Sequence, residues 1–181
     1  MPADEVEYAE ATLGVLQPVL RGIGKVDESK QTPCREFNIA QLTDHLMNSI
    51  TQIGGAAGAE VPERDTTAPV ETQVMDAARP ALQAWHMRGV DGTVPFGERE
   101  APAKMFIGVL AVEFLVHAWD YAMATGQKLQ PPDDVADYVL GVARQVITNR
   151  PGAGFDEPVP IADDAAVFDR LIAFTGRNPA G

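Results

Sequence analysis

The chain has 181 residues and a formal net charge of −12, with 26 acidic against 14 basic side chains. This acidic balance argues against a nucleic-acid partner, which needs a basic surface, and against an anionic membrane as partner. Hydrophobic residues make up 45% and charged residues 22% of the chain, which is typical of a globular protein. The single cysteine, Cys34, cannot form an internal disulfide, and the acidic N-terminus is no signal peptide. We therefore expect a cytoplasmic protein whose residues 1–181 form a single domain.

Apolar side chains at spacings of three, four and seven residues predict helices over residues 5–23, 38–55 and 70–88. Pro18 is expected to bend or end the first helix, and Pro80 to kink the third. Asn38 is a favourable N-cap for the second helix, which should stop at Gly54-Gly55. The segments between these helices, and residues 89–100 after the third, have the polar, glycine- and proline-containing composition of loops.

The fourth predicted helix, residues 102–125, is apolar nearly all round. Of the twenty residues in 105–124, sixteen are apolar, and the polar exceptions include Glu113, His117 and Asp120. These interruptions argue against a membrane span, so we expect this helix to lie in the centre of the domain. Two further helices are predicted over residues 133–149 and 164–175. No segment is a convincing strand, and the predicted fold class is all-α, a four-helix bundle with extra C-terminal helices.

The three polar interruptions of the fourth helix share one stripe of its surface. At about 100° per residue, His117 lies about 40° from Glu113, and Asp120 about 20° on its other side. A buried carboxylate must be paired, protonated or bound to a metal, and a carboxylate and an imidazole one turn apart can share a metal ion. The alternative is a Glu–His hydrogen bond, or an ordinary i,i+4 pair on an exposed edge.

Two protein ligands are too few for a typical transition-metal site, and the chain has only two other histidines. His86 stands near the end of the third predicted helix, a position typical of a solvated histidine favoured by the helix dipole. His45 lies at the flank of the aliphatic stripe of the second helix. At this position it can be interpreted either as a structural or exposed histidine or as a third ligand. Cys34 is interpreted as a packing cysteine, with a reactive thiol as the alternative.

Two segments carry a resemblance to a known family. Residues 32–46 contain Thr32-Pro33-Cys34, an aromatic residue and Leu42-Thr43-Asp44-His45, and residues 113–126 contain Leu115-Val116-His117-Ala118-Trp119-Asp120 and Ala124-Thr125-Gly126. These runs are similar to those of the DinB-like metal-binding helical bundles, and within them of the mycothiol-dependent maleylpyruvate isomerase N-terminal (metal-binding) domain family. Residues 169–179 resemble the end of short, single-domain members. Phe37 departs from the pattern, because a tryptophan is common at its position.

The resemblance implies a DinB-like four-helix bundle in which His45, Glu113 and His117 hold a divalent metal. Two imidazoles and a carboxylate suit zinc, with nickel possible as well. The remaining coordination position would take a low-molecular-weight thiol such as mycothiol, which the metal deprotonates. The implied function is a metal-dependent, thiol-using transferase or isomerase acting on a small electrophilic substrate. In the family's isomerase a second, C-terminal domain helps to form the active site. This chain ends where that domain would begin, which argues against maleylpyruvate isomerisation itself.

The alternative function is a non-catalytic metal-binding or interaction module of the same fold, and a homodimer is compatible with either. We expect Asp120 to hydrogen-bond His117 and fix its tautomer; the alternatives are that it faces the site directly or is a surface acid beside Trp119. If the metal is removed, Glu113 among apolar neighbours is expected to take up a proton, with a raised pKa.

Overall fold

The computed structural model describes residues 1–148 and 154–181. Most of these residues are helical, which confirms the predicted fold class. The elements are α1 (Glu5–Arg21), η1 (a 3₁₀ turn, Lys25–Asp27), α2 (Ile39–Ala56), α3 (Val70–Arg88), β1 (Thr93–Phe96), β2 (Arg99–Pro102), α4 (Ala103–Ala124), α5 (Asp133–Val146) and α6 (Val167–Phe174).

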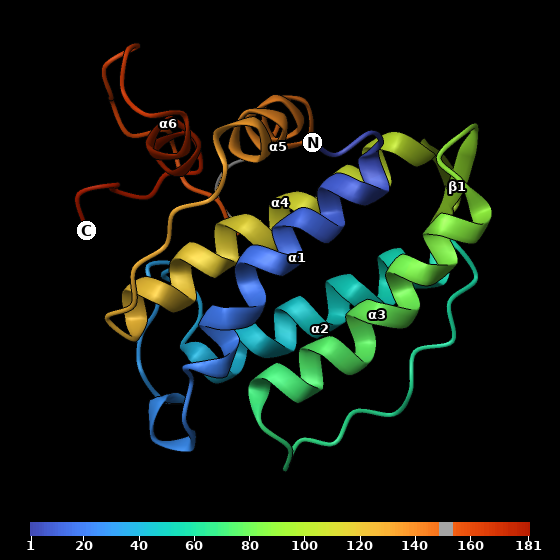
Figure 1. Ribbon diagram of the computed structural model, residues 1–181, viewed down its shortest axis with the longest axis horizontal. Helices are drawn as coiled ribbons and strands as arrows, with labels where there is room; N and C mark the ends of the chain where they lie inside the picture. Colours follow the sequence, from blue (N-terminus) through green and yellow to red (C-terminus); the bar gives the residue numbers. More distant parts are fainter. Residues whose placement is uncertain (149–153) are drawn as a thin grey trace.

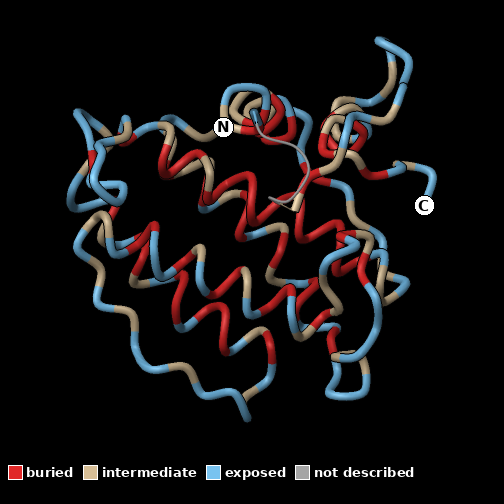
Figure 2. The backbone as a smooth tube through the Cα atoms, turned by 180° about the vertical axis from the view of Figure 1, so that it is seen from behind, coloured by how far each residue is buried: buried red, intermediate tan, exposed pale blue. Residues whose placement is uncertain are grey.

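Helices α1 to α4 pack as a four-helix bundle (Figure 1). In this bundle α4 contacts α1 and α2, and α3 closes the ring against the same two helices. Helix α5 packs on α4 outside the bundle, and α6 packs on α5. Because α4 has neighbours on several sides, every residue in 110–122 is buried, and the buried backbone runs through the middle of the molecule (Figure 2). This position explains why the sequence of α4 is apolar all round.

Among the described helices, α4 is the one whose length and hydropathy would allow it to cross a membrane. In this structure 89% of its most apolar stretch is buried inside the protein. Helix α4 therefore buries its apolar surface within the protein, as the core helix of a bundle does.

Local sequence signals determine where the first two helices begin. The side chain of Asp4 accepts a hydrogen bond from the backbone N–H of Glu7 and caps α1. At the start of α2, Asn38 and Gln41 form a reciprocal capping box, with each side chain bonded to the other residue's backbone N–H. The cap establishes the beginning of α2, and with it the turn on which His45 stands.

Two glycines allow neighbouring helices to approach closely. A Cβ atom added at Gly54 of α2 would lie 2.7 Å from the Cβ of Ala81 on α3, and one added at Gly108 of α4 would lie 3.0 Å from Cγ1 of Val142 on α5. Both distances are at or below the limit of ordinary carbon contacts, so only glycine fits without displacement. Near the α2–α3 crossing, the indole N–H of Trp85 donates to the carbonyl of Ile53 at 3.0 Å.

The hairpin formed by β1 and β2 corrects the prediction that residues 89–100 are a loop and that the chain lacks strands. The two strands pair antiparallel, with Phe96 opposite Arg99, and Gly97 takes a φ of 61° in the turn between them. A tight hairpin needs this positive φ, which glycine adopts at little cost. Each strand has four residues, and Val94 is the one fully buried residue among them, so no alternation is visible in the sequence.

Two helix ends differ in detail from the prediction, and both prolines lie within their helices. Pro18 and Pro80 lie inside α1 and α3, and neither of them ends its helix. Helix α5 ends at Val146, before the predicted end at Asn149, which lies outside the described residues. Helix α6 begins three residues later than predicted, at Val167 instead of residue 164.

Candidate metal centre

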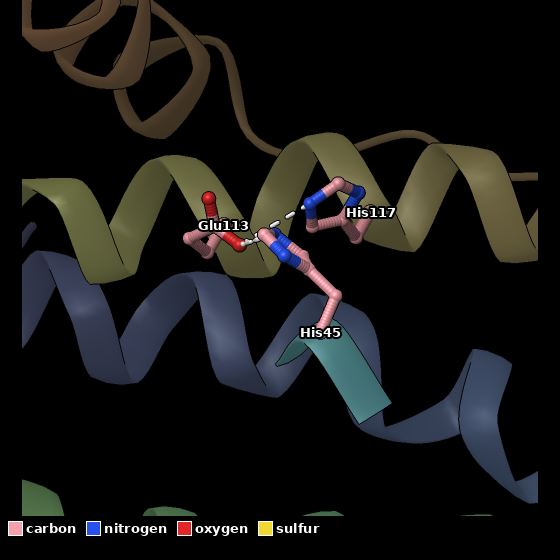
Figure 3. Close-up of side chains that lie close together, drawn as sticks. All are labelled: His45, Glu113 and His117. Atoms are coloured by element: carbon pink, nitrogen blue, oxygen red, sulfur yellow. Dashed lines mark hydrogen bonds and ion pairs between the residues drawn. The ribbon is translucent and has the colours of Figure 1, made fainter. Parts of the chain in front are cut away.

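Helices α2 and α4 bring His45, Glu113 and His117 together in the bundle (Figure 3). Glu113 and His117 stand one turn apart on α4, and His45 reaches them from α2. The Nε2 atom of His45 lies 2.8 Å from Oε2 of Glu113, and Nε2 of His117 lies 3.2 Å from the same oxygen. All three potential ligand atoms lie within 4.8 Å of one another, which is close enough for one ion to contact each of them.

The cluster is buried on its α4 side and reaches solvent through His45. The side chain of His45 is 29% exposed, whereas those of Glu113 and His117 are 8% and 1% exposed. The ring of Phe37 stacks on His45 with a centroid separation of 5.2 Å. Phe37 therefore covers part of His45, the one partly exposed residue of the three.

Ser49 is a fourth polar neighbour that the sequence did not reveal. It lies one turn beyond His45 on α2, and its hydroxyl donates to Oε2 of Glu113 at 3.3 Å. The i,i+4 spacing from His45 places Ser49 on the same face of α2. A serine at this spacing is too common on helix surfaces to have singled it out.

The charges of Glu113 and His117 stabilise each other. Burial alone would raise the pKa of Glu113, but the imidazoles of His117 and His45 outweigh burial and hold it well below its usual range. Burial would likewise lower the pKa of His117, but the carboxylates of Glu113 and Asp120 outweigh burial and raise it to about 9. The expectation that a metal-free Glu113 takes up a proton is therefore wrong. The neighbouring imidazole takes the proton instead.

Asp120 lies against the other nitrogen of His117. Its Oδ2 accepts a hydrogen bond from Nδ1 of His117 at 2.8 Å, and both side chains are buried. Burial would raise the pKa of Asp120, but the guanidinium of Arg177 and the imidazole of His117 outweigh burial and lower it. Since an ionised carboxylate can only accept, Nδ1 of His117 carries a proton. When the ring is neutral, its lone pair is therefore on Nε2, the atom that faces Glu113.

Arg177 completes this arrangement, although no sequence motif points to it. Its Nε and Nη2 atoms donate to Oδ1 and Oδ2 of Asp120 at 2.7 and 2.8 Å. One signal was available: a carboxylate buried in an apolar helix needs a counter-charge, and Arg177 is the one basic residue in 171–181. Periodicity could not connect the two residues, because they are 57 positions apart.

The remaining candidates, His86 and Cys34, are not members of the cluster. His86 pairs with Glu10 of α1 through a 2.7 Å contact, and its side chain is 42% exposed, in line with the predicted solvated position. Cys34 is buried, its Sγ lies 3.7 Å from the carbonyl oxygen of Gly154, and burial raises the pKa of its thiol to about 11. Cys34 is therefore a packing residue, since a reactive cysteine needs a lowered pKa.

The residues of the cluster fit a divalent cation. Among the described residues, Nε2 of His117 is a buried nitrogen without a hydrogen-bond partner, although it lies 3.2 Å from Oε2 of Glu113 in an ion-pair contact. An unpaired buried polar atom is uncommon in a folded protein. A cation between the three side chains would satisfy it, and two imidazole nitrogens with one carboxylate oxygen are a donor set that zinc and nickel accept.

Comparison with known proteins identifies relatives without an assigned activity. No protein-family model matches the chain, and no solved structure matches it. The chain is similar to the uncharacterized protein Rv0738 of Mycobacterium tuberculosis strain ATCC 25618 / H37Rv and to the uncharacterized protein MT0763 of strain CDC 1551 / Oshkosh. Each is 31% identical to it over 152 residues, which cover 81% of this chain and 83% of the relative. The names of these relatives assign no activity, so the function is inferred from the site itself.

Proposed function

This chain belongs to the same family as the mycobacterial protein Rv0738, and we propose that it is a divalent-metal-binding protein that uses a low-molecular-weight thiol to modify a small electrophile. The observation that carries the proposal is the cluster of His45, Glu113 and His117, whose ligand atoms lie within 4.8 Å of one another in an apolar bundle. The resemblance to the DinB-like bundles, and to the mycothiol-dependent maleylpyruvate isomerase family in particular, supports the choice of a thiol.

Each residue of the cluster has a distinct task in this proposal. His45 and His117 would supply nitrogen ligands and Glu113 an oxygen ligand, and three protein ligands leave a position for a further molecule. A cation held there lowers the pKa of a coordinated thiol and so supplies a thiolate at neutral pH. Asp120 keeps the proton of His117 on Nδ1, so that Nε2 is free to bind.

The exposure of His45 indicates how a thiol and its substrate would reach the cluster. Because Glu113 and His117 are buried and His45 is partly exposed, an entering molecule passes the α2 side, beside the ring of Phe37. A thiol stays reduced in a reducing compartment, so the proposal includes a cytoplasmic location. Zinc is the preferred ion, with nickel as the alternative.

A second candidate function is metal binding without turnover. The deep burial of Glu113 and His117 favours it, because little of the cluster is open to a substrate. In that case the ion is sequestered or serves the fold, and no thiol reaction takes place.

Elemental analysis of the purified protein tests the part that both candidates share. We expect about one zinc or nickel ion per chain in the parent protein and a large loss in His45→Ala, because this substitution removes one of three ligands. Transfer of mycothiol, or of cysteine as a simpler thiol, to a small electrophile would then be measured with and without zinc. Zinc-dependent transfer favours the enzyme, whereas bound zinc without transfer favours the second candidate. A parent protein that binds neither metal rejects both.

A further inference from the structure

A series of buried hydrogen bonds joins Arg177, near the C-terminus, to the candidate ligand His117. Arg177 donates to both oxygens of Asp120 at 2.7 and 2.8 Å, and Oδ2 of Asp120 accepts from Nδ1 of His117 at 2.8 Å. The side chains of Arg177, Asp120 and His117 are 3%, 0% and 1% exposed. The carboxylate of Asp120 therefore links the C-terminal segment to the His45–Glu113–His117 cluster. The hydrogen bonds on both sides of this carboxylate are shielded from water.

Arg177 also fastens two chain segments to α4. Its Nη1 donates to the carbonyl of Thr175 and its Nη2 to that of Gly154, both at 3.2 Å, and its guanidinium lies 5.6 Å from the ring centroid of Phe155. The segment after α6 and the residues Gly154 and Phe155 thus meet at the guanidinium that holds Asp120. Lysine cannot reproduce this grip, because a single ammonium lacks the planar two-point contact of a guanidinium.

We propose that Arg177 is a positioning residue for the metal centre. It holds Asp120 by two oxygens, so that this carboxylate stays on Nδ1 of His117 and Nε2 stays directed at the ion. Residues that hydrogen-bond a ligand histidine commonly tune metal affinity in this way. By linkage, metal binding and docking of the C-terminal segment stabilise each other. The inference rests on the proposed metal-binding function.

A purely structural role of Arg177 is the competing explanation. Asp120 needs a counter-charge whether or not a metal binds, and breaking a buried ion pair on one side destabilises any protein. A single substitution cannot distinguish the two roles. The double variant Asp120→Asn/Arg177→Gln distinguishes them, because it removes both charges together and leaves neither charged side chain buried without its partner.

The experiment measures zinc affinity by competition with a chelator, together with thermal unfolding, in the parent, Arg177→Lys, Arg177→Gln, Asp120→Asn and the double variant. We expect Arg177→Lys and Arg177→Gln to weaken zinc binding by roughly 10-fold. In the Asp120→Asn background, Arg177→Gln should change affinity by less than about twofold, because its effect passes through Asp120. Arg35→Gln is the matched control, since it breaks the exposed 2.9 Å pair with Asp156 in the same region and should leave zinc affinity unchanged.

Two results would overturn the inference. One is an equal loss of affinity from Arg177→Gln in both backgrounds, and the other is parental affinity in a folded Arg177→Lys protein. If the parent binds no zinc, the proposed function fails, and ¹⁵N NMR of His117 in alkaline solution, where the ring is neutral, decides the inference by itself. We then expect a proton on Nδ1 in the parent and a mixture of tautomers in Arg177→Gln. The same tautomer in both proteins would reject a positioning role.

Discussion

At the scale of single residues, one oxygen atom organises the cluster. The Oε2 atom of Glu113 lies 2.8 Å from His45 Nε2, 3.3 Å from Ser49 Oγ and 3.2 Å from His117 Nε2. The carboxylate is thus the common neighbour of the other three side chains. Its negative charge also compensates the positive charge that either an ion or a protonated imidazole brings into the bundle.

Replacing Glu113 should therefore abolish metal binding. We expect Glu113→Ala to lose nearly all bound metal, because the substitution removes one of three ligands together with the one carboxylate, among the described residues, that contacts both imidazoles. Metal per chain, measured by elemental analysis, checks this. Glu98→Ala, at an exposed position in the hairpin turn, is the control and should keep the parental amount. Parental metal content in Glu113→Ala would reject the assignment.

The raised pKa of His117 predicts how the stability of the metal-free protein depends on pH. Folding raises this pKa from 6.5 to about 9, so the protonated ring stabilises the native state fully below pH 6.5. This contribution, on the order of 1–3 kcal/mol, should be lost as pH rises through 9. Urea unfolding of metal-free protein between pH 6 and 10 measures it.

Substitution of histidines identifies the origin of that pH dependence. His117→Asn should flatten the fall in unfolding free energy, whereas His86→Ala, which removes an exposed ring on the other side of the bundle, should preserve it. A fall of the same size in His117→Asn would show that another group is responsible.

At the scale of the elements, the site depends on the position of α2 against its neighbours. His45 approaches Glu113 where α2 packs on α4, and α2 packs on α3 as well. The absence of a side chain at Gly54 allows the close approach to Ala81 of α3. The next residue, Gly55, lies in the same helix and has no heavy atom within 4 Å of the place its Cβ would occupy.

This pair of glycines supplies a matched test of the α2–α3 contact. Gly54→Ala should destabilise the fold by about 1–3 kcal/mol, since its methyl would overlap Ala81. Gly55→Ala should instead stabilise it by about 0.5–1 kcal/mol, because alanine is the better helix former and meets no obstacle. Chemical denaturation of both variants checks the difference. Equal effects of the two substitutions would contradict the close crossing.

At the scale of the whole molecule, the core is built from apolar side chains, and we expect it to form without a metal ion. Large buried side chains from all four bundle helices fill it, among them Leu16, Ile50, Trp85 and Phe114. Each fully buried large side chain contributes roughly 1.5–3 kcal/mol. The bundle thus differs from small zinc-dependent domains, whose fold is lost without the ion.

We therefore expect the metal-free protein to keep its helical circular dichroism at neutral pH and to gain thermal stability when zinc binds. The gain should be larger at pH 8 than at pH 6, because a proton on His117 competes with the metal. Melting curves with and without zinc at the two pH values check both statements. Loss of helical signal on metal removal, or a zinc effect that is independent of pH, would contradict them.

Much of this molecule could be predicted from its sequence. The helices and the central position of α4 follow from the periodicity and density of apolar residues, which are local properties of the chain. The stripe of Glu113, His117 and Asp120 follows from helix geometry, and the cost of burying carboxylates indicates that these groups need partners. The short hairpin was missed, since its four-residue strands show no alternation.

Only the tertiary structure decided which partners these polar side chains of α4 have. His45 and Glu113 are 68 positions apart, and Asp120 and Arg177 are 57 apart. Periodicity describes which face of a helix is apolar, but it does not say which other helix, or which turn of the tail, that face will meet. Packing made those choices. In the folded protein α2 lies beside α4 and Arg177 lies against Asp120. The guanidinium supplies the counter-charge that this buried carboxylate needs.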